Sequence, residues 1–415
     1  MRQLCRRACL LFLTGLLFCG APAQAAEKPK VRAITAFVRL EPANYKAQIA
    51  ETLVVLRRAK AAFEKAGYEV QTLRITPQPF SVMAKEMPRE QVLAFYAEHE
   101  ALAKKEGFLS AIGPVLFRDE DDPRLTDLYA EILAQHPGLD GSIIVADEDG
   151  VHWSAVRAAA RIMKYLEEHT PHSQGNFGFA AAAMVEPYTP FYPASYHLGR
   201  GQQFAVAVQG ASVVDEAFRS SRGDFDKARR SLEREMTVHA LAIADVSKRI
   251  AEATGWTFMG VDCSTAPLKD VSIGAAIEKL TGAPFGSSGT LSATALITGV
   301  LRELHVDRVG YNGVMLPVLE DERLAQRWSE GRLTLDALLA YSAVCGTGLD
   351  TVPLPGDITE AQLARIIGDV ASLAHKLRKP LTARLMPVAG KKAGDRTEFS
   401  DPFLTNAVIQ PLPRD

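Results

Sequence analysis

Short apolar runs alternate with longer stretches of helical periodicity along this chain. The runs have the length of strands and are apolar on both faces, which is typical of parallel sheets covered by helices. Helices of roughly 10 to 20 residues fit most of the stretches between them. The pattern therefore predicts an α/β fold with ten strands, at residues 31–38, 68–75, 108–112, 142–146, 177–185, 204–208, 258–261, 309–316, 349–352 and 381–387.

Ten strands exceed the eight of the common β/α barrel. No change of composition and no linker rich in Pro or Ser divides the chain. The most acceptable boundary, near residues 199–203, separates five strands from five. We therefore expect one domain over residues 26–415, made of halves at about 26–200 and 201–415.

The N-terminus has the pattern of a secretory signal peptide. Arg2, Arg6 and Arg7 precede the apolar run 10–18, and an A-x-A cleavage pattern follows at residues 23–25. We expect cleavage of residues 1–25 or so and a periplasmic or secreted protein; the alternative is an uncleaved anchor. No later run of 18 apolar residues exists, so no membrane association is expected after cleavage.

Composition excludes several classes of partner and cofactor. A net charge of −2 and the lack of a basic stripe give no indication of nucleic-acid binding. The nine histidines are scattered without a metal-binding motif, so we predict no metal and see no indication of a cofactor. The sequence leaves open whether the protein forms a homo-oligomer.

Sites in parallel α/β proteins lie at the carboxyl ends of the strands. Each polar residue after a strand is, taken singly, more typical of a solvated loop, but together they should meet at one rim. They are Arg39, Asp147, Glu186, Gln209, Asp262, Cys263, Ser264, Asn312, Asp357, Lys391 and Lys392.

Five of the residues near strand ends are candidates for catalysis. Asp262 could orient a substrate or act as a base, and Cys263 or Ser264 could be a nucleophile, although no G-x-S-x-G motif surrounds Ser264. Glu186 and His197 could serve in acid–base chemistry. His197 ends a Pro- and Tyr-rich loop from Tyr188, which is either a lid over the site or a rigid loop packed by its own aromatic rings.

Two further groups could bind an anion, with Asn312 as an additional ligand contact. Ser287 and Ser288 precede a helix within a glycine-rich loop, which suits an anion but equally suits a simple helix cap; the phosphate-binding P-loop motif is absent. Arg384 lies on an apolar strand and should point inward, with Lys391 and Lys392 beyond it. A buried arginine needs a carboxylate, either from the protein, with Asp350 as the candidate, or from a ligand.

Cys263 and Cys345 are the cysteines left after signal cleavage. Cys263 follows a strand and Cys345 precedes one, so we place them at opposite ends of the barrel and expect two free thiols.

Four segments, at residues 261–282, 284–301, 310–357 and 379–399, resemble the family called domain of unknown function 711, also named uncharacterised protein family 0210. The likeness continues, more loosely, back to ITAFVRL at residues 34–40. It implies a ten-stranded β/α barrel similar to pyruvate formate-lyase and the glycyl-radical enzymes.

The glycyl-radical pattern itself is missing. The C-terminal motif R-V-x-G-[FY] does not occur, and Cys263 stands alone where a pair of thiols would be expected. We therefore expect a non-radical enzyme, a lyase, isomerase or hydrolase, acting on a small anionic metabolite. The alternative is an exported small-molecule binding protein without catalysis.

Overall fold

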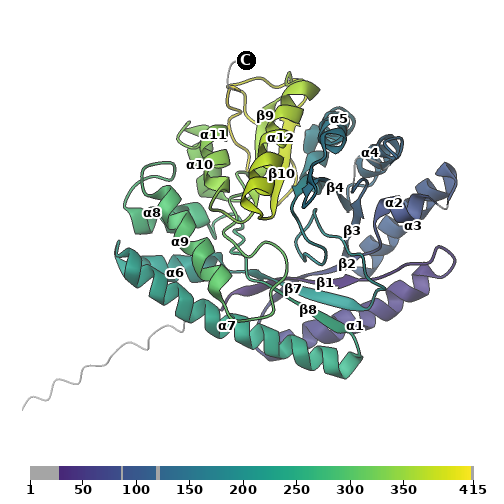
Figure 1. Ribbon diagram of the computed structural model, residues 1–415, viewed down its shortest axis with the longest axis horizontal. Helices are drawn as coiled ribbons and strands as arrows, with labels where there is room; N and C mark the ends of the chain where they lie inside the picture. Colours follow the sequence, from purple (N-terminus) through teal and green to yellow (C-terminus); the bar gives the residue numbers. More distant parts are fainter. Residues whose placement is uncertain (1–27, 86, 118–121, 413–415) are drawn as a thin grey trace, which may run out of the picture.

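A computed structural model describes residues 28–85, 87–117 and 122–412 (Figure 1). The predicted signal peptide lies outside the described residues. Within these described residues, ten strands form one sheet, with β5 paired only to β4 and the rest in the order β8-β7-β1-β2-β3-β4-β6-β10-β9. The strands are β1 (Lys30–Phe37), β2 (Val70–Thr76), β3 (Leu109–Pro114), β4 (Leu139–Asp147), β5 (Gly150–Val151), β6 (Phe179–Ala183), β7 (Gln203–Gln209), β8 (Thr257–Asp262), β9 (Gly348–Pro355) and β10 (Leu381–Val388).

Strand direction divides the sheet into two sets. Strands β1, β2, β3, β4 and β6 run parallel to one another, as do β7 with β8 and β9 with β10. Where the sets meet, β1 pairs antiparallel with β7, and β6 pairs antiparallel with β10. The direction changes after Ala183, near the predicted boundary of the two halves. The carboxyl ends of the two sets consequently point to opposite ends of the molecule.

Residues 307–318 run between the edge strands β8 and β9. Val261 N donates to Asp307 O at 2.8 Å, and Val318 N donates to Asp350 O at 2.9 Å. Isolated bridges join the same stretch to both strands, but no continuous ladder forms, so the sheet is not closed. The predicted strand 309–316 is therefore wrong as a regular strand. Positive φ angles at Gly310 (83°) and Asn312 (46°) interrupt an extended backbone there.

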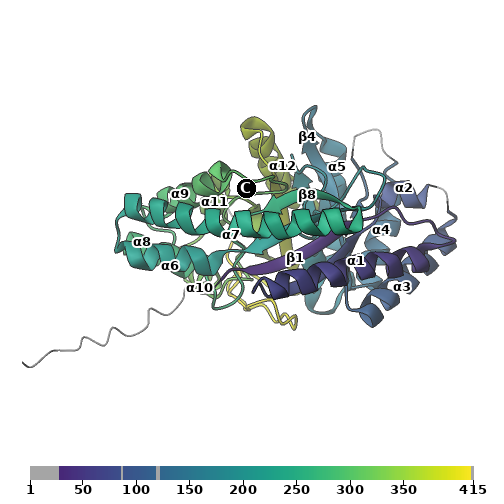
Figure 2. The same ribbon diagram turned by 90° about the horizontal axis from the view of Figure 1, so that it is seen from below.

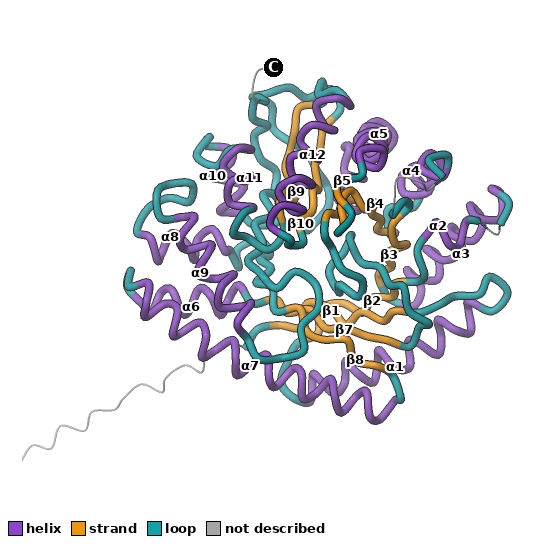
Figure 3. The backbone as a smooth tube through the Cα atoms, viewed as in Figure 1, coloured by secondary structure: helices purple, strands orange, loops and turns teal. Residues whose placement is uncertain are grey.

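Helices cover the outside of the sheet (Figures 1 and 3). Figure 2 shows the long helices α1 and α7 side by side across β1 and β8. Among the described residues, no helix combines the length and apolar character needed to cross a membrane. The helices are α1 (Tyr45–Lys65), α2 (Phe80–Ala84), α3 (Arg89–Glu106), α4 (Leu125–Gln135), α5 (Trp153–His169), the 3-10 helix η1 (Pro171–Gly178), α6 (Ala211–Ser221), α7 (Phe225–Thr254), α8 (Ile273–Thr281), α9 (Thr290–Glu303), α10 (Glu322–Ser329), α11 (Leu335–Ser342) and α12 (Glu360–Leu377).

The connection between β6 and β7, residues 184–202, enters the space that the strands surround; we call it the interior loop (Figure 3). Its Phe191, Ala194 and Tyr196 belong to a buried cluster with small strand residues such as Ala182 and Ala207. The alanines leave room for the loop between the strands. Of the two interpretations of this aromatic segment, the packed loop describes its position.

Candidate functional site

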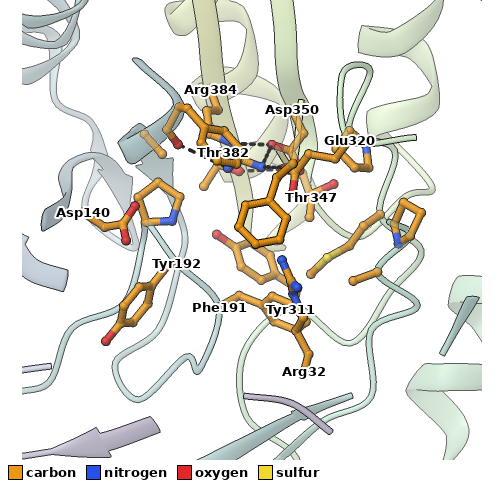
Figure 4. Close-up of a pocket in the computed structure, with 18 of the residues that line it drawn as sticks. Arg32, Asp140, Phe191, Tyr192, Tyr311, Glu320, Thr347, Asp350, Thr382 and Arg384 are labelled. Carbon is orange, nitrogen blue, oxygen red and sulfur yellow. Dashed lines mark hydrogen bonds and ion pairs between the residues drawn. The ribbon is translucent and has the colours of Figure 1, made fainter. Parts of the chain in front are cut away.

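A cavity of about 120 Å³ lies inside the sheet, at the end where the first set of strands begins. This volume is below the roughly 300–1,000 Å³ of drug-sized ligand pockets, so it suits a small molecule. Apolar walls come from the interior loop and from residues such as Phe177, Met315 and Phe403. The polar lining consists of Arg32, Arg74, Asp140, Tyr192, Tyr311, Glu320, Thr347, Asp350, Thr382 and Arg384. Figure 4 labels all of these except Arg74.

Arg384, at the centre of β10, has carboxylate partners from the protein. Its Nε donates to Asp350 Oδ1 at 2.7 Å, and its Nη2 pairs with Glu320 (Figure 4). Burial raises the pKa of Asp350, while Arg384 opposes that rise. The structure thus favours the internal ion pair that the sequence suggested with Asp350, and it adds Glu320 as a second partner.

Arg32 and Arg74 line the same cavity from β1 and β2. Among the described residues, no carboxylate lies within 4.0 Å of either guanidinium. Arg74 donates to Pro190 O at 3.2 Å and lies 4.6 Å from the ring centre of Tyr192. Arg32 lies 5.7 Å from the ring centre of Phe403. These two cations are therefore available to a negatively charged ligand.

Burial governs the protonation of both arginines. It lowers the pKa of Arg74 to about 10, with the charge of nearby Arg32 acting in the same direction. Burial also lowers the pKa of Arg32, while Glu320 opposes that effect. Both side chains remain cationic at neutral pH, at the cost of placing two like charges in one cavity.

Asp140, at the start of β4, faces this cavity with a carboxyl group that makes no hydrogen bond to the described residues (Figure 4). Burial raises its pKa to about 7, although Arg74 and Arg384 pull it down. A carboxyl group with this pKa exchanges a proton easily at neutral pH. Perturbed carboxyl groups in cavities are typical of functional sites.

The Asp262 carboxylate is buried and surrounded by hydrogen-bond donors of the protein. Its carboxylate accepts hydrogen bonds from Tyr311 N at 2.8 Å, Ser264 N at 3.0 Å and Asn312 N at 3.2 Å. Burial raises the pKa of Asp262, and these bonds oppose the rise. Asn312 in turn accepts from Cys263 N at 3.1 Å. The group fixes the backbone that places the Tyr311 side chain in the cavity wall.

The predicted nucleophiles are enclosed. Cys263 is fully buried, and burial raises the pKa of its thiol to about 12, so it is not a thiolate near neutral pH. Ser264 Oγ donates to Asp262 Oδ1 at 2.5 Å and is also fully buried. Neither residue lines the cavity.

The structure does not bring the predicted rim together. Glu186 is exposed beyond β6, and His197 is buried against Val38 O at 2.8 Å, beyond the end of β1. Arg39 follows β1 and Asp147 ends β4, two strands of the same set. They lie at the end opposite to the carboxyl ends of β8 and β10, because the two sets of strands are antiparallel. The prediction of a single rim at the carboxyl ends assumed that all strands run in the same direction.

The remaining predicted residues lie away from the cavity lining. Ser287 and the exposed Ser288 lie in the loop between α8 and α9, where Gly286 packs against the carbonyl of Arg332. Lys391 pairs with Glu398 at 2.9 Å, and Lys392 is exposed in the turn after β10. Gln209 and Asp357 also lie outside the lining. Arg384 is the predicted site residue that the cavity contains.

Cys263 and Cys345 are both free and buried. The sequence suggested that the two cysteines lie a strand length apart, at opposite ends of the barrel. In the structure their segments lie closer together than that. Thr265 bridges to Val314, and Gly346 N donates to Val314 O at 2.7 Å, so one chain passes between the two cysteine segments. Chains on either side of a third lie roughly 10 Å apart, beyond the ~7 Å limit for the Cα atoms of a disulfide. The expectation of free thiols remains, for a different reason.

No group of three or more His, Cys, Asp or Glu residues suited to a metal ion occurs in the part of the chain that the structure describes. Arg32, Arg74 and Asp140 were missed by the sequence analysis. The signal for Arg32 was present, since it interrupts an apolar strand as Arg384 does, whereas Arg74 follows the polar residues Gln71 and Thr72 in a mixed stretch and does not stand out. Asp140 begins its strand, so only the antiparallel arrangement of the two sets shows that it belongs to the site.

An α/β sheet in two antiparallel sets, with a loop in its interior and a charged cavity at one end, defines a barrel-like α/β protein. The chain belongs to the family described as "Uncharacterised ACR (DUF711)", whose model matches residues 24–400. This confirms the resemblance seen in the sequence.

Relatives called UPF0210 proteins occur in archaea and bacteria. That of Pyrobaculum islandicum is 32% identical over 392 residues, covering 88% of this chain and 86% of the relative. That of Pyrobaculum aerophilum is 33% identical over 414 residues, covering 92% and 90%. A solved structure of the anaerobic ribonucleotide reductase from Thermotoga maritima, with dATP and CTP, is similar at a TM-score of 0.42 and 11% identity, covering 85% of this chain and 75% of that one.

Proposed function

We propose that this protein is an enzyme acting on a small anionic metabolite, without radical chemistry. Arg32 and Arg74 bind the anionic group, and Asp140 transfers a proton to or from the substrate. The observation that supports this is one cavity holding two arginines without carboxylate partners and a carboxyl group with a pKa of about 7.

The arginines supply the binding argument. A buried charge without a partner is costly, so a protein that keeps two of them close together gains from a ligand that neutralises them. The planar guanidinium group donates paired hydrogen bonds to a carboxylate or phosphate. The carboxylates of Asp350 and Glu320 form ion pairs with Arg384 and not with Arg32 or Arg74.

Asp140 supplies the chemical argument. A general acid or base works best when its pKa lies near the working pH, and Asp140 satisfies this at neutral pH. Its carboxyl group faces the cavity without a hydrogen-bonding partner from the described protein. Proton transfer fits a lyase, an isomerase or a hydrolase.

A thermal-shift screen of small anionic metabolites tests the binding part. A ligand at 100 times its dissociation constant should raise the free energy of unfolding by about 2.7 kcal/mol. We expect Arg74→Met to weaken the same ligand by about 10- to 100-fold, since hydrogen bonds to charged groups contribute roughly 1.5–3 kcal/mol.

Arg57→Met is the matched control. Arg57 lies on α1, far along the outside of the sheet, with an exposed side chain paired to Glu106 at 3.0 Å. This variant should bind the ligand as the wild-type protein does. A ligand that stabilises the wild type and Arg74→Met equally would contradict the proposed site.

With a ligand in hand, Asp140→Asn separates catalysis from binding. Loss of an acid–base group costs about 10²- to 10⁴-fold in rate. Binding without any conversion of the ligand by the wild-type protein would instead favour the exported binding protein.

We also propose that the protein is exported, on the strength of the N-terminal charge, the short apolar run and the cleavage pattern before Ala26. Mass spectrometry of the soluble protein should give a chain that starts near Ala26, and the protein should be found in the periplasmic or extracellular fraction. An intact N-terminus on soluble protein would contradict export by cleavage.

A further inference from the structure

We propose that a small carboxylate enters the cavity together with one proton, and that Asp140 holds this proton. The inference rests on the proposed anion site at Arg32 and Arg74, and it adds the charge state of the bound complex. It follows from the positions of the charged groups around Asp140.

Asp140 faces charged groups on several elements. Arg74 approaches from β2 and Arg384 from β10, while Glu320 and Asp401 approach from the segment after 318 and from the C-terminal tail. Two tyrosines complete the surroundings, Tyr192 of the interior loop and Tyr129 of α4. Because Arg384 already pairs with Asp350 and Glu320, Arg74 is the uncommitted cation near Asp140.

An anion bound by Arg74 takes up that cation. Asp140 then lies beside a second negative charge, in a cavity from which the ligand has displaced water. Two anions that share a buried site are not both ionised without a large cost, so one of them binds a proton. Asp140, whose pKa is already about 7, is the group that takes it.

The cavity favours a short carboxylate as the ligand. Its volume of about 120 Å³ leaves room for few atoms, and its walls include the rings of Phe177, Phe191 and Phe403. A protonated Asp140 can donate a hydrogen bond to the bound carboxylate, which an ionised Asp140 would repel. Sulfate has no apolar part, so it gains less binding free energy from the aromatic walls than a short carboxylate does.

Isothermal titration calorimetry with acetate, propionate and sulfate tests this on the mature protein. Measurements at about pH 8.5 in two buffers of different ionisation enthalpy should show uptake of about one proton per bound carboxylate. At about pH 5.5 the uptake should vanish, because Asp140 is then protonated beforehand. Above neutral pH, the affinity for carboxylate should fall as the pH rises, approaching a tenfold loss per pH unit. Sulfate should bind more weakly than propionate.

Asp140→Asn should bind carboxylate with no proton uptake and with little dependence on pH. Asp401→Asn is the matched control, a carboxyl group near Asp140 but outside the cavity lining, and it should keep the uptake. The uptake on the wild-type protein is decisive by itself should a variant fail to fold.

The outcomes separate the two proposals. Carboxylate binding that depends on Arg74 but takes up no proton overturns this inference and leaves the proposed anion site intact. Tighter binding of sulfate than of propionate overturns the choice of ligand class. No binding of any of these anions, or binding that Arg74→Met leaves unchanged, overturns both proposals.

Discussion

Arg384→Met is expected to lower the free energy of unfolding by about 3–5 kcal/mol at neutral pH. Arg384 is the shared partner of Asp350 and Glu320, and all three side chains are at least nine-tenths buried. Without the guanidinium, two buried carboxylates face each other with no cation between them. Urea denaturation at constant temperature gives the free energy of unfolding directly.

The pH dependence of this variant has a definite sign. The pKa of Asp350 is already raised by burial, and loss of Arg384 raises it further. A carboxyl group with a raised pKa in the folded state contributes its stability at low pH and loses it as the pH rises through that pKa. The deficit of Arg384→Met should therefore be smaller at about pH 5 than at about pH 8.

Arg249→Met is the control for loss of an arginine ion pair at the surface. Arg249 pairs with Asp245 on α7, and both side chains are more than half exposed. Exposed pairs of this kind contribute roughly 0.3–0.5 kcal/mol. An equal, small effect of both substitutions would show that Arg384 is not the neutralising centre of a buried triad.

Asp262→Ala is expected to lower the free energy of unfolding by at least about 3 kcal/mol, since each unsatisfied buried donor costs about 1–3 kcal/mol. The substitution leaves the amides of Ser264, Tyr311 and Asn312 without their acceptor. Asp262→Asn keeps one acceptor oxygen and should cost less. Chemical denaturation of both variants gives the comparison.

Asp224→Ala is a suitable control, because Asp224 also accepts a backbone hydrogen bond, from Lys227 N at 2.9 Å, but at an exposed helix start. Loss of such a cap costs about 1 kcal/mol. If Asp262→Ala were as stable as Asp224→Ala and yet lost all turnover of an identified substrate, Asp262 would be a catalytic residue and the structural role would fail.

Much of the fold follows from local sequence patterns. Helix α1 lies between the predicted strands 31–38 and 68–75, and α7 lies between the predicted strands 204–208 and 258–261, where helices were expected. The stretch 309–316 was wrong as a strand because an apolar run does not reveal the positive φ angles at Gly310 and Asn312. The direction of the second set of strands was also hidden, since a strand has the same apolar pattern in either direction.

The site was less predictable than the fold for the same reason. Burial of Arg384 and its pairing with Asp350 could be predicted, because both depend on side chains in adjacent strands. The cavity depends on which strand ends share one end of the molecule. Asp140 joins Arg384 there because β6 and β10 run in opposite directions, which no local pattern contains.

The interior loop also determines how a molecule could reach this cavity. Phe191, Tyr192 and Pro193 of this loop form the inner wall of the cavity. Tyr196 and His197 continue the loop toward the other end of the sheet. The interior loop thus fills the space that the strands surround. A ligand of the proposed site would therefore enter and leave the cavity on the side away from the interior loop.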